Sequence, residues 1–386
     1  MTIPGETGWL QDRDAQTVCE AVMNGGYRIY FVGGCVRNAL LGLPDSDVDL
    51  STNARPEAVM ALSKEAGLKA VPTGIEHGTV TVVSGGKPFE VTTFRRDVAT
   101  DGRRALVAFS DDIAEDARRR DFTMNALYAT PKGTLVDPLG GLPDLLARRV
   151  RFIEDATARI REDYLRILRY FRFCAHYADP AAGFDPETLN AVAAQSEGLK
   201  TLSAERIGME MRKLLAARDP APALAAMRQT GVLARVLPGS DDRWLGILVH
   251  LEERLAQQPR WLTRLAALGG EAAAQRLRLS RAEARDLVLL QNLSSAAISV
   301  EEIAYRHGAQ IAVAALLLRH AMRETLPETS VLEKVSAAAE QVFPIRATDL
   351  MRELRGPALG AALSRLETAW IESGFVLSRA ELLDRV

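Results

Sequence analysis

RIYFVGGCVRNALLGLPDSDVDL, residues 28–50, is the stretch that decides the fold. A β-type run over residues 27–32 ends in Gly33-Gly34, an apolar helical run follows, and a turn leads to Asp47-Val48-Asp49. Paired glycines let the backbone approach a ligand closely. A helix that begins beside them directs the positive end of its dipole to the same point. The order strand, glycine turn, helix, turn, strand therefore predicts a phosphate-binding corner in an α/β domain.

Asp47 and Asp49 are the candidate catalytic residues of this stretch. Residues i and i+2 of an extended strand point to the same face, and two neighbouring carboxylates are commonly held together by a divalent cation. Two-metal phosphoryl transfer uses this arrangement. Arg37, one turn into the helix, is placed to reach a phosphate oxygen. A glycine pair alone, or two such aspartates alone, is common in surface loops, so the combination carries the hypothesis.

A second pair of strands is predicted at residues 79–83 and 89–94, joined by a glycine-rich hairpin, with a helix over residues 56–66 before them. Glu90 lies in the later strand. Two interpretations are open for it: a third carboxylate beside the aspartate pair, or an edge-strand glutamate that faces water. The residues alone favour the second.

Strand signals fade near residue 150, and later segments such as 155–178, 204–217 and 221–236 show helical periodicity. The predicted fold class is α+β, an α/β head over residues 1–150 followed by an all-helical remainder.

Arg118, Arg119 and Arg120 precede a second helical run in ARRRDFTMNALY, where Asp121 and Thr123 are good capping residues. Cations at a helix start have the unfavourable sign for the helix dipole. A polyphosphate or nucleic acid nearby would remove that disadvantage, although a solvated charge run is an equal alternative. Before them, residues 97–107 are predicted to form a mobile loop, a feature often tied to function.

Asp163, Arg166, Arg169 and Arg172 are spaced by three residues in REDYLRILRYFRF, which predicts one ridge along a helix. A salt-bridged surface ridge is the commoner explanation. The functional one is base selection, because cytosine and adenine both present an amino group beside a ring-nitrogen acceptor. A carboxylate accepts from the amino group and a guanidinium donates to the nitrogen.

Composition excludes several other classes of protein. The 386 residues are 47% hydrophobic with a net charge of −2, unlike a histone-like binder of nucleic acid. The three cysteines form no CxxC pair, which argues against zinc and disulfide frameworks. We find no secretory leader and no bilayer-spanning run, so a cytoplasmic protein without a membrane partner is expected.

Together, GGCVRNALLG, SDVDL, RRRDFTMNALY, DPLGG and EDYLRILRYFRF resemble the class II tRNA nucleotidyltransferases, the CCA-adding enzymes, whose superfamily includes bacterial poly(A) polymerases. The resemblance covers residues 28–175. It implies a polymerase β-like nucleotidyltransferase head (1–150), a helical neck that selects the nucleotide (151–210), and a helical body and tail that bind tRNA (211–386).

The resemblance also implies a role for each candidate residue. Asp47 and Asp49 match the ligands of catalytic Mg²⁺, and Glu90 matches a third carboxylate. Asp163 and Arg166 match the amino-acid template for CTP and ATP. The full set of implied nucleotide contacts is Gly33, Gly34, Arg37, Arg120, Asp163, Arg166, Arg169 and Arg172.

The expected function is template-independent addition of C, C and A to the 3′ end of tRNA from CTP and ATP, with release of pyrophosphate. The loop over residues 97–107 is expected to help reset the pocket between C and A. A poly(A) polymerase or an A-adding partial enzyme is the alternative, and a catalytically silent RNA-binding module is a remote one. The sequence leaves the oligomeric state open.

Overall fold

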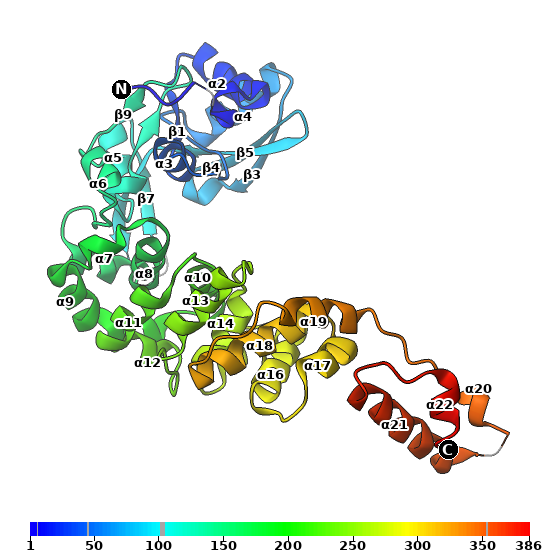
Figure 1. Ribbon diagram of the computed structural model, residues 1–386. Helices are drawn as coiled ribbons and strands as arrows, with labels where there is room; N and C mark the ends of the chain where they lie inside the picture. Colours follow the sequence, from blue (N-terminus) through cyan, green and yellow to red (C-terminus); the bar gives the residue numbers. More distant parts are fainter. Residues whose placement is uncertain (6, 45, 101–104, 353) are drawn as a thin grey trace. The chain divides into compact units, whose positions relative to one another are not determined.

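The structure is a computed structural model that describes every residue except 6, 45, 101–104 and 353, and it divides into two compact units (Figure 1). The first unit contains Met1–Leu214 and Pro222–Val236. The second contains Leu215–Ala221 and Leu237–Val386.

A seven-stranded mixed sheet forms the centre of the N-terminal part of the first unit, in the order β3-β4-β5-β2-β1-β8-β9. Its strands are β1 (Ile29–Val32), β2 (Asp49–Thr52), β3 (Lys69–Gly74), β4 (Thr79–Ser84), β5 (Lys87–Thr93), β8 (Tyr128–Ala129) and β9 (Leu135–Val136). β2 and β5 run parallel, whereas the other neighbours are antiparallel. The predicted hairpin is confirmed, because β4 and β5 are joined through Gly85 and Gly86.

Two helices, α2 (Arg13–Asn24) and α4 (Pro56–Glu65), pack together against this sheet (Figure 1). The alternating burial of β4 supplies the complementary apolar face. α4 confirms the helix predicted from Pro56, a residue whose fixed φ suits the first helical turn. The head is completed by α1 (Gly8–Gln11), α3 (Gly34–Leu41), α5 (Ile113–Arg118) and α6 (Leu142–Leu146), with short 3₁₀ turns η1 (Ile75–His77) and η2 (Thr123–Asn125).

The prediction of a loop at residues 97–107 is wrong for the part of this segment that the structure describes. β6 (Arg95–Thr100) and β7 (Ala105–Phe109) form an antiparallel ribbon, with Arg95 opposite Phe109. Residues 101–104 lie outside the described residues. Such a ribbon is held by backbone hydrogen bonds, which a polar sequence makes as well as an apolar one. The polar composition of the segment was therefore no evidence against strands.

Helices make up the rest of the first unit. They are α7 (Ala156–Glu162), α8 (Leu165–Tyr177), α9 (Pro186–Gln195), α10 (Ala204–Leu215), which ends at the unit boundary, α11 (Ala221–Gln229) and α12 (Val232–Val236), with 3₁₀ turns η3 (Pro180–Ala182) and η4 (Ser196–Thr201). The helical character predicted for residues 155–178 and 221–236 is confirmed, and each of these segments forms two helices, α7 and α8 in the first and α11 and α12 in the second.

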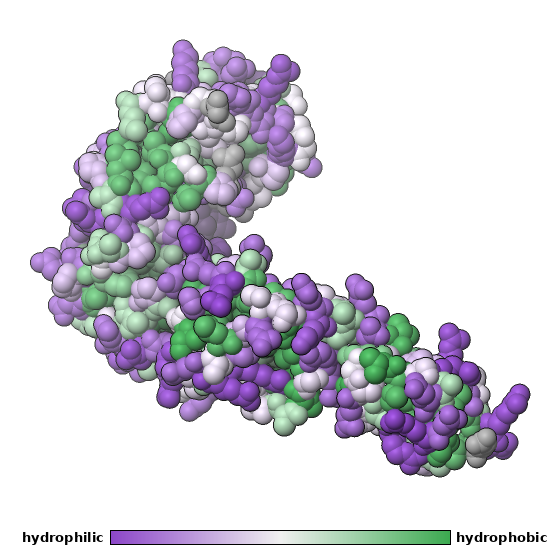
Figure 2. All heavy atoms as spheres, in the orientation of Figure 1, coloured by the Kyte–Doolittle hydropathy of each residue, from purple (hydrophilic) through white to green (hydrophobic). Residues whose placement is uncertain are grey.

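The described part of the second unit is helical. Its helices are α13 (Leu245–Arg254), α14 (Trp261–Leu268), α15 (Ala273–Arg276), α16 (Arg281–Ser295), α17 (Val300–His307), α18 (Ala309–Arg323), α19 (Val331–Ala339), α20 (Ala347–Leu350), α21 (Gly356–Glu372) and α22 (Arg379–Leu383). One apolar core joins α16 to α19, and another gathers around Trp370. Within the described chain, no helix has the length and apolarity to cross a bilayer. Hydrophilic side chains cover much of the face drawn in Figure 2.

Candidate active site

Acidic side chains meet where β2 and β5 lie side by side. Asp49, the first residue of β2, pairs with Glu90 in the parallel register. Asp49 is exposed to solvent, yet protein atoms around its carboxylate, the nearby Glu90 and then Asp47 raise its pKa to about 6, against the opposing charge of Arg120. The three carboxylates therefore share one acidic site.

The structure corrects two expectations about these carboxylates. β5 is paired on both sides, by β4 and β2, so the edge-strand interpretation of Glu90 is wrong. The strand expected to carry both Asp47 and Asp49 begins at Asp49, so Asp47 lies in the connection before it.

The glycine turn predicted between strand and helix is present and lines the same cavity as Asp49. Gly33 caps α3 with φ 74° and ψ −119°, a backbone conformation that residues with a Cβ rarely adopt. A Cβ at Gly34 would lie 2.8 Å from the Ser46 hydroxyl. A Cβ at Gly33 would lie 3.5 Å from Nη1 of Arg120, so this arginine stands directly over the turn.

Arg120 is held in place by two buried groups. Its Nη2 donates to Asp116 and its Nε to the Tyr128 hydroxyl, both at 3.2 Å. Burial alone would raise the pKa of Asp116, but the charges of Arg120 and Arg119 outweigh it and hold that pKa well below its usual range. The arginine is therefore both charged and fixed.

The helix predicted to begin after Arg118–Arg120 is wrong. These arginines lie at the end of α5, not at a start. At a helix C-terminus the dipole attracts cations, so their charge suits the local fold before any ligand is considered.

The segment that carries Asp163 departs from the predicted ridge. Asp163 has an extended conformation, φ −154° and ψ 106°, and separates α7 from α8. Its Oδ1 accepts the amide of Leu165 (3.1 Å), and its Oδ2 accepts Nη2 of Arg206 in α10 (2.6 Å). An aspartate that hydrogen-bonds to a nearby backbone amide competes with helix continuation, which explains the break.

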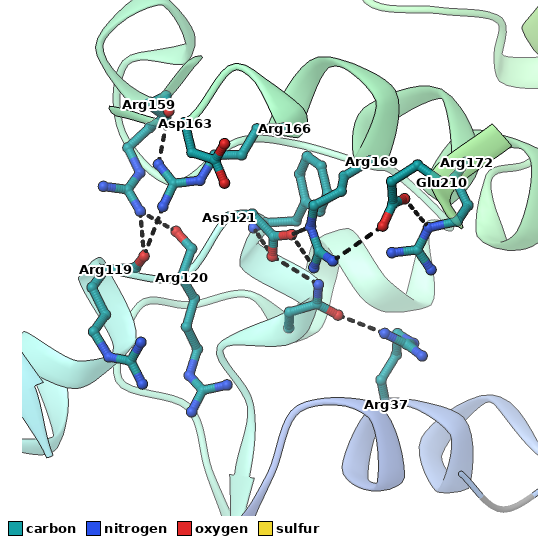
Figure 3. Close-up of polar contacts among 12 residues, drawn as sticks. Arg37, Arg119, Arg120, Asp121, Arg159, Asp163, Arg166, Arg169, Arg172 and Glu210 are labelled. Carbon is teal, nitrogen blue, oxygen red and sulfur yellow. Dashed lines mark hydrogen bonds and ion pairs between the residues drawn. The ribbon is translucent and has the colours of Figure 1, made fainter. Parts of the chain in front are cut away.

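Arg166 lies on α8 and makes separate contacts. Its Nη1 donates to Glu162 Oε2 (2.5 Å) and to the Arg159 carbonyl (2.7 Å), and its Nη2 donates to the Arg119 carbonyl (3.1 Å). Asp163 and Arg166 therefore share the cavity while each has its own protein partners. Figure 3 shows the contacts of Arg166 with the carbonyls of Arg159 and Arg119.

A chain of hydrogen bonds and ion pairs links α3 to α8 and α10 (Figure 3). Asn125 accepts from Arg37 Nη1 (2.6 Å) and donates to Asp121 Oδ1 (2.9 Å). Asp121 Oδ2 accepts from Arg169 Nε (2.6 Å), and burial, which would raise its pKa, is outweighed by the Arg169 charge, so the pKa is lowered. Glu210 continues the chain, 3.9 Å from Arg169 Nη1, and accepts from Nε of Arg172 (2.6 Å).

One cavity of about 410 Å³ brings most of the candidate residues together. It is lined by Gly33, Gly34, Arg37, Asp49, Arg120, Asp121, Asn125, Asp163, Leu165, Arg166, Arg169, Phe173 and Arg206. Arginines outnumber aspartates in this lining, which suits a polyphosphate. Arg172 is not in the lining and instead stacks on Phe173 and binds Glu210. Asp47 and Glu90 are not in the lining, but both lie near Asp49, which is.

Several site residues were missed by the sequence analysis. They are Asp116, Asn125, Arg206 and Glu210, each of which holds a candidate residue. Two of them carry a local signal, since Asn125 follows Arg120 within the same motif and Asp116 lies four residues before Arg120. Arg206 and Glu210 come from α10, whose contacts with α8 and the residues before it depend on tertiary packing.

The acidic site suits a hard divalent cation, because carboxylate oxygens are the ligands that Mg²⁺ prefers. Among the described residues, no three His, Cys, Asp or Glu side chains already converge as a metal cage. Mg²⁺ commonly takes only one or two carboxylates and completes its shell with water and substrate phosphates. The paired Asp49 and Glu90 fit that mode of binding.

This fold and this cavity define a nucleotidyltransferase. The model of the Poly A polymerase head domain matches residues 29–151, and the model of the probable RNA and SrmB-binding site of polymerase A matches residues 183–243.

Two relatives that match this chain over most of their own length identify the family within the nucleotidyltransferases. CCA tRNA nucleotidyltransferase 1, mitochondrial, of Danio rerio is 33% identical over 388 residues, 95% of this chain and 88% of that protein. The CCA-adding enzyme of Limosilactobacillus fermentum is 32% identical over 389 residues, which cover 93% of this chain and 92% of that enzyme. The chain belongs to the family of class II CCA tRNA nucleotidyltransferases, whose members generally use divalent metal ions.

Solved structures agree with that assignment. The Bacillus stearothermophilus CCA-adding enzyme in complex with CTP superposes with a TM-score of 0.75 at 30% identity, covering 97% of both chains. The Thermotoga maritima CCA-adding enzyme complexed with tRNA, at 19% identity and a TM-score of 0.71, shares the fold.

Proposed function

We propose that this protein adds C, C and A in turn to the 3′ end of tRNA, using CTP and ATP and releasing pyrophosphate. The observation that carries the proposal is the single cavity that joins Asp49 to Asp163 and Arg166. Groups suited to phosphoryl transfer and groups suited to recognising a base thus face the same space. The relatives of full length support the same activity.

In the proposed reaction, the 3′-hydroxyl of tRNA loses its proton to solvent water, and its oxygen bonds to the α-phosphorus of the nucleotide. The bond from that phosphorus to the β-phosphate oxygen breaks, and pyrophosphate leaves with the electron pair. Asp47, Asp49 and Glu90 would hold Mg²⁺, which supplies charge stabilisation at the reacting phosphate. The amides at Gly33-Gly34 and the side chains of Arg37 and Arg120 bind the triphosphate and orient it for in-line attack.

We assign the choice of base to Asp163 and Arg166, and a further contact with the nucleotide to Arg169. Arg172 would support Arg169 through Glu210, which lies near both arginines. The Asp163 carboxylate accepts from the amino group of C or A, and Arg166 donates to the neighbouring ring nitrogen. The Asp163→Ala variant should lose preference for CTP and ATP over UTP and GTP. A variant that keeps the full preference would refute this assignment.

The remaining roles follow the division predicted from the sequence. We assign catalysis to residues 1–150, nucleotide selection to residues 151–210 and tRNA binding to residues 211–386. Three free cysteines support a reducing compartment, and we propose the cytoplasm, although several animal relatives are named mitochondrial. Imaging of a tagged chain tests the location.

The decisive experiment supplies labelled CTP and ATP with Mg²⁺ to a tRNA that lacks its 3′ CCA. We expect three additions and then a stop, with the Asp49→Ala variant inactive. Because the matched family models carry poly A polymerase names, A-only or poly(A) addition is the second candidate. Extended A tracts without use of CTP would favour that candidate, and no incorporation by the folded protein would reject both.

A further inference from the structure

The conformation of Asp163 is set by contacts from both sides of its carboxylate. Oδ1 accepts the amide of Leu165, the first residue of α8, and Oδ2 accepts Nη2 of Arg206. These two bonds fix the plane of the carboxylate. A carboxylate offers about four lone-pair directions, so two remain for a ligand in the cavity.

Arg206 comes from a helix that is itself anchored. It lies in the first turn of α10, where the Ser203 hydroxyl accepts the Arg206 amide at 3.4 Å. Its side chain is about one-third exposed and also lines the cavity. Functional groups on rigid elements are positioned more accurately than groups on loops. Arg206 thus brings a positive charge to Asp163, one of the two residues that lie between α7 and α8.

The same face of α10 makes a second contact of opposite sign. Glu210, one turn after Arg206 and 5% exposed, binds Arg172 and lies near Arg169. Residues four apart lie on one face of a helix. α10 therefore presents a cation to the aspartate before α8 and an anion to the arginines of α8 (Figure 3 shows the Glu210 contacts).

We infer that Arg206 is a positioning residue for base selection: it orients the Asp163 carboxylate so that its free lone pairs face the amino group of C or A. The inference rests on the proposed function. Without Arg206, the carboxylate keeps only the Leu165 amide and turns about its side-chain bonds. Its alignment with the amino group is then lost, and discrimination against U and G falls, because hydrogen-bond recognition depends on geometry.

The test compares Arg206→Ala, Arg206→Lys and Lys213→Ala in single-nucleotide addition to tRNA. The control, Lys213, is an exposed cation on the same helix. We expect Arg206→Ala to lower the kcat/KM ratio of CTP over UTP by roughly tenfold or more, the size of losing a charged hydrogen bond. Arg206→Lys should restore most of the ratio, and Lys213→Ala should leave it unchanged.

A folded Arg206→Ala protein with the wild-type ratio would overturn the inference, as would equal slowing of correct and incorrect nucleotides. If Arg206→Ala does not fold, Arg206→Met takes its place, because it keeps the length of the chain without the charge. Equilibrium competition between CTP and UTP is measured alongside and needs no catalysis. A wild-type protein that prefers CTP in binding but extends no tRNA would count against the proposed function and not against the role of Arg206.

Discussion

At the scale of single residues, the site holds one carboxylate whose charge the protein disfavours. The pKa of Asp49 is raised to about 6 by desolvation, Glu90 and Asp47. A carboxyl whose folded pKa exceeds its unfolded value binds the extra proton in the folded state, so folding stability falls as pH rises through that window. A bound cation would offset the repulsion among these carboxylates and so favour the charged form of Asp49.

Asp49→Asn is therefore expected to stabilise the protein in chelator while abolishing nucleotide addition. The difference in unfolding free energy should be near zero at pH 4, grow as pH rises to about 6 and then level off. Because Asp49 is exposed, solvent screening limits the gain to at most about 1 kcal/mol. Urea unfolding at several pH values measures it, and equal or lower stability of the variant at pH 7.5 would contradict the expectation.

A second residue-scale prediction concerns Asn125, which bridges two buried charges. Asn125→Ala leaves the Arg37 Nη1 donor and the Asp121 Oδ1 acceptor without this shared partner. Loss of a partner for buried polar groups costs about 1–3 kcal/mol. We expect a fall of that size in unfolding free energy and a higher KM for the nucleotide.

Asn190→Ala is the matched control for that change, since Asn190 is exposed on α9 in the same unit. It should change neither quantity. Comparable losses in the two variants would show that the bridge between Arg37 and Asp121 has no special importance.

At the scale of elements, the break between α7 and α8 matters most, because it places Asp163 at the cavity. Tyr164, next in the chain, packs its ring against Gly198 in η4, and a Cβ at Gly198 would overlap that ring. The break is therefore supported by a close approach that only glycine permits.

Gly198→Ala is expected to push the Tyr164 ring away and to lower the unfolding free energy by about 1–3 kcal/mol, the usual effect of overpacking. Thermal unfolding measures the loss. The double variant Gly198→Ala, Tyr164→Ala removes the clash, so the two changes should be less than additive. Strict additivity would mean that the two residues do not compete for the same space.

At the scale of the whole molecule, the two units have separate cores. In the second unit Arg264 is 1% exposed and binds Glu252 (2.7 Å), with further bonds to the carbonyls of Leu215, Ala217 and Arg218. Desolvation raises the pKa of Glu252 despite this partner. A buried pair of this kind becomes costly when one member is removed.

Arg264→Ala should destabilise the second unit by about 3–5 kcal/mol. Three of the four tryptophans, Trp244, Trp261 and Trp370, lie in that unit, so their fluorescence reports its unfolding in urea. Nucleotide binding in the first unit should be unchanged, because its cavity contains none of these contacts. The exposed Arg254→Ala on α13 is the control, and an equal loss there would contradict the role of the buried pair.

Local physics explains which parts of this protein the sequence by itself determined. The glycine turn, the helix from Pro56 and the β4–β5 hairpin follow from backbone preferences of a few neighbouring residues. The change from strands to helices near residue 150 follows from hydrophobic periodicity. The candidate residues could also be identified from the sequence, because they lie in short motifs that occur in a fixed order along the chain.

Only the tertiary structure decided which partners those residues have. It placed Glu90 beside Asp49 inside the sheet, ended α5 at the arginines, broke the helix at Asp163, brought Arg206 to the cavity and paired Glu210 with Arg172. Each outcome depends on a contact between residues distant in the chain or on competition between a side chain and the backbone. Such contacts leave no periodic pattern in the sequence, because they are fixed by packing rather than by local conformational preference.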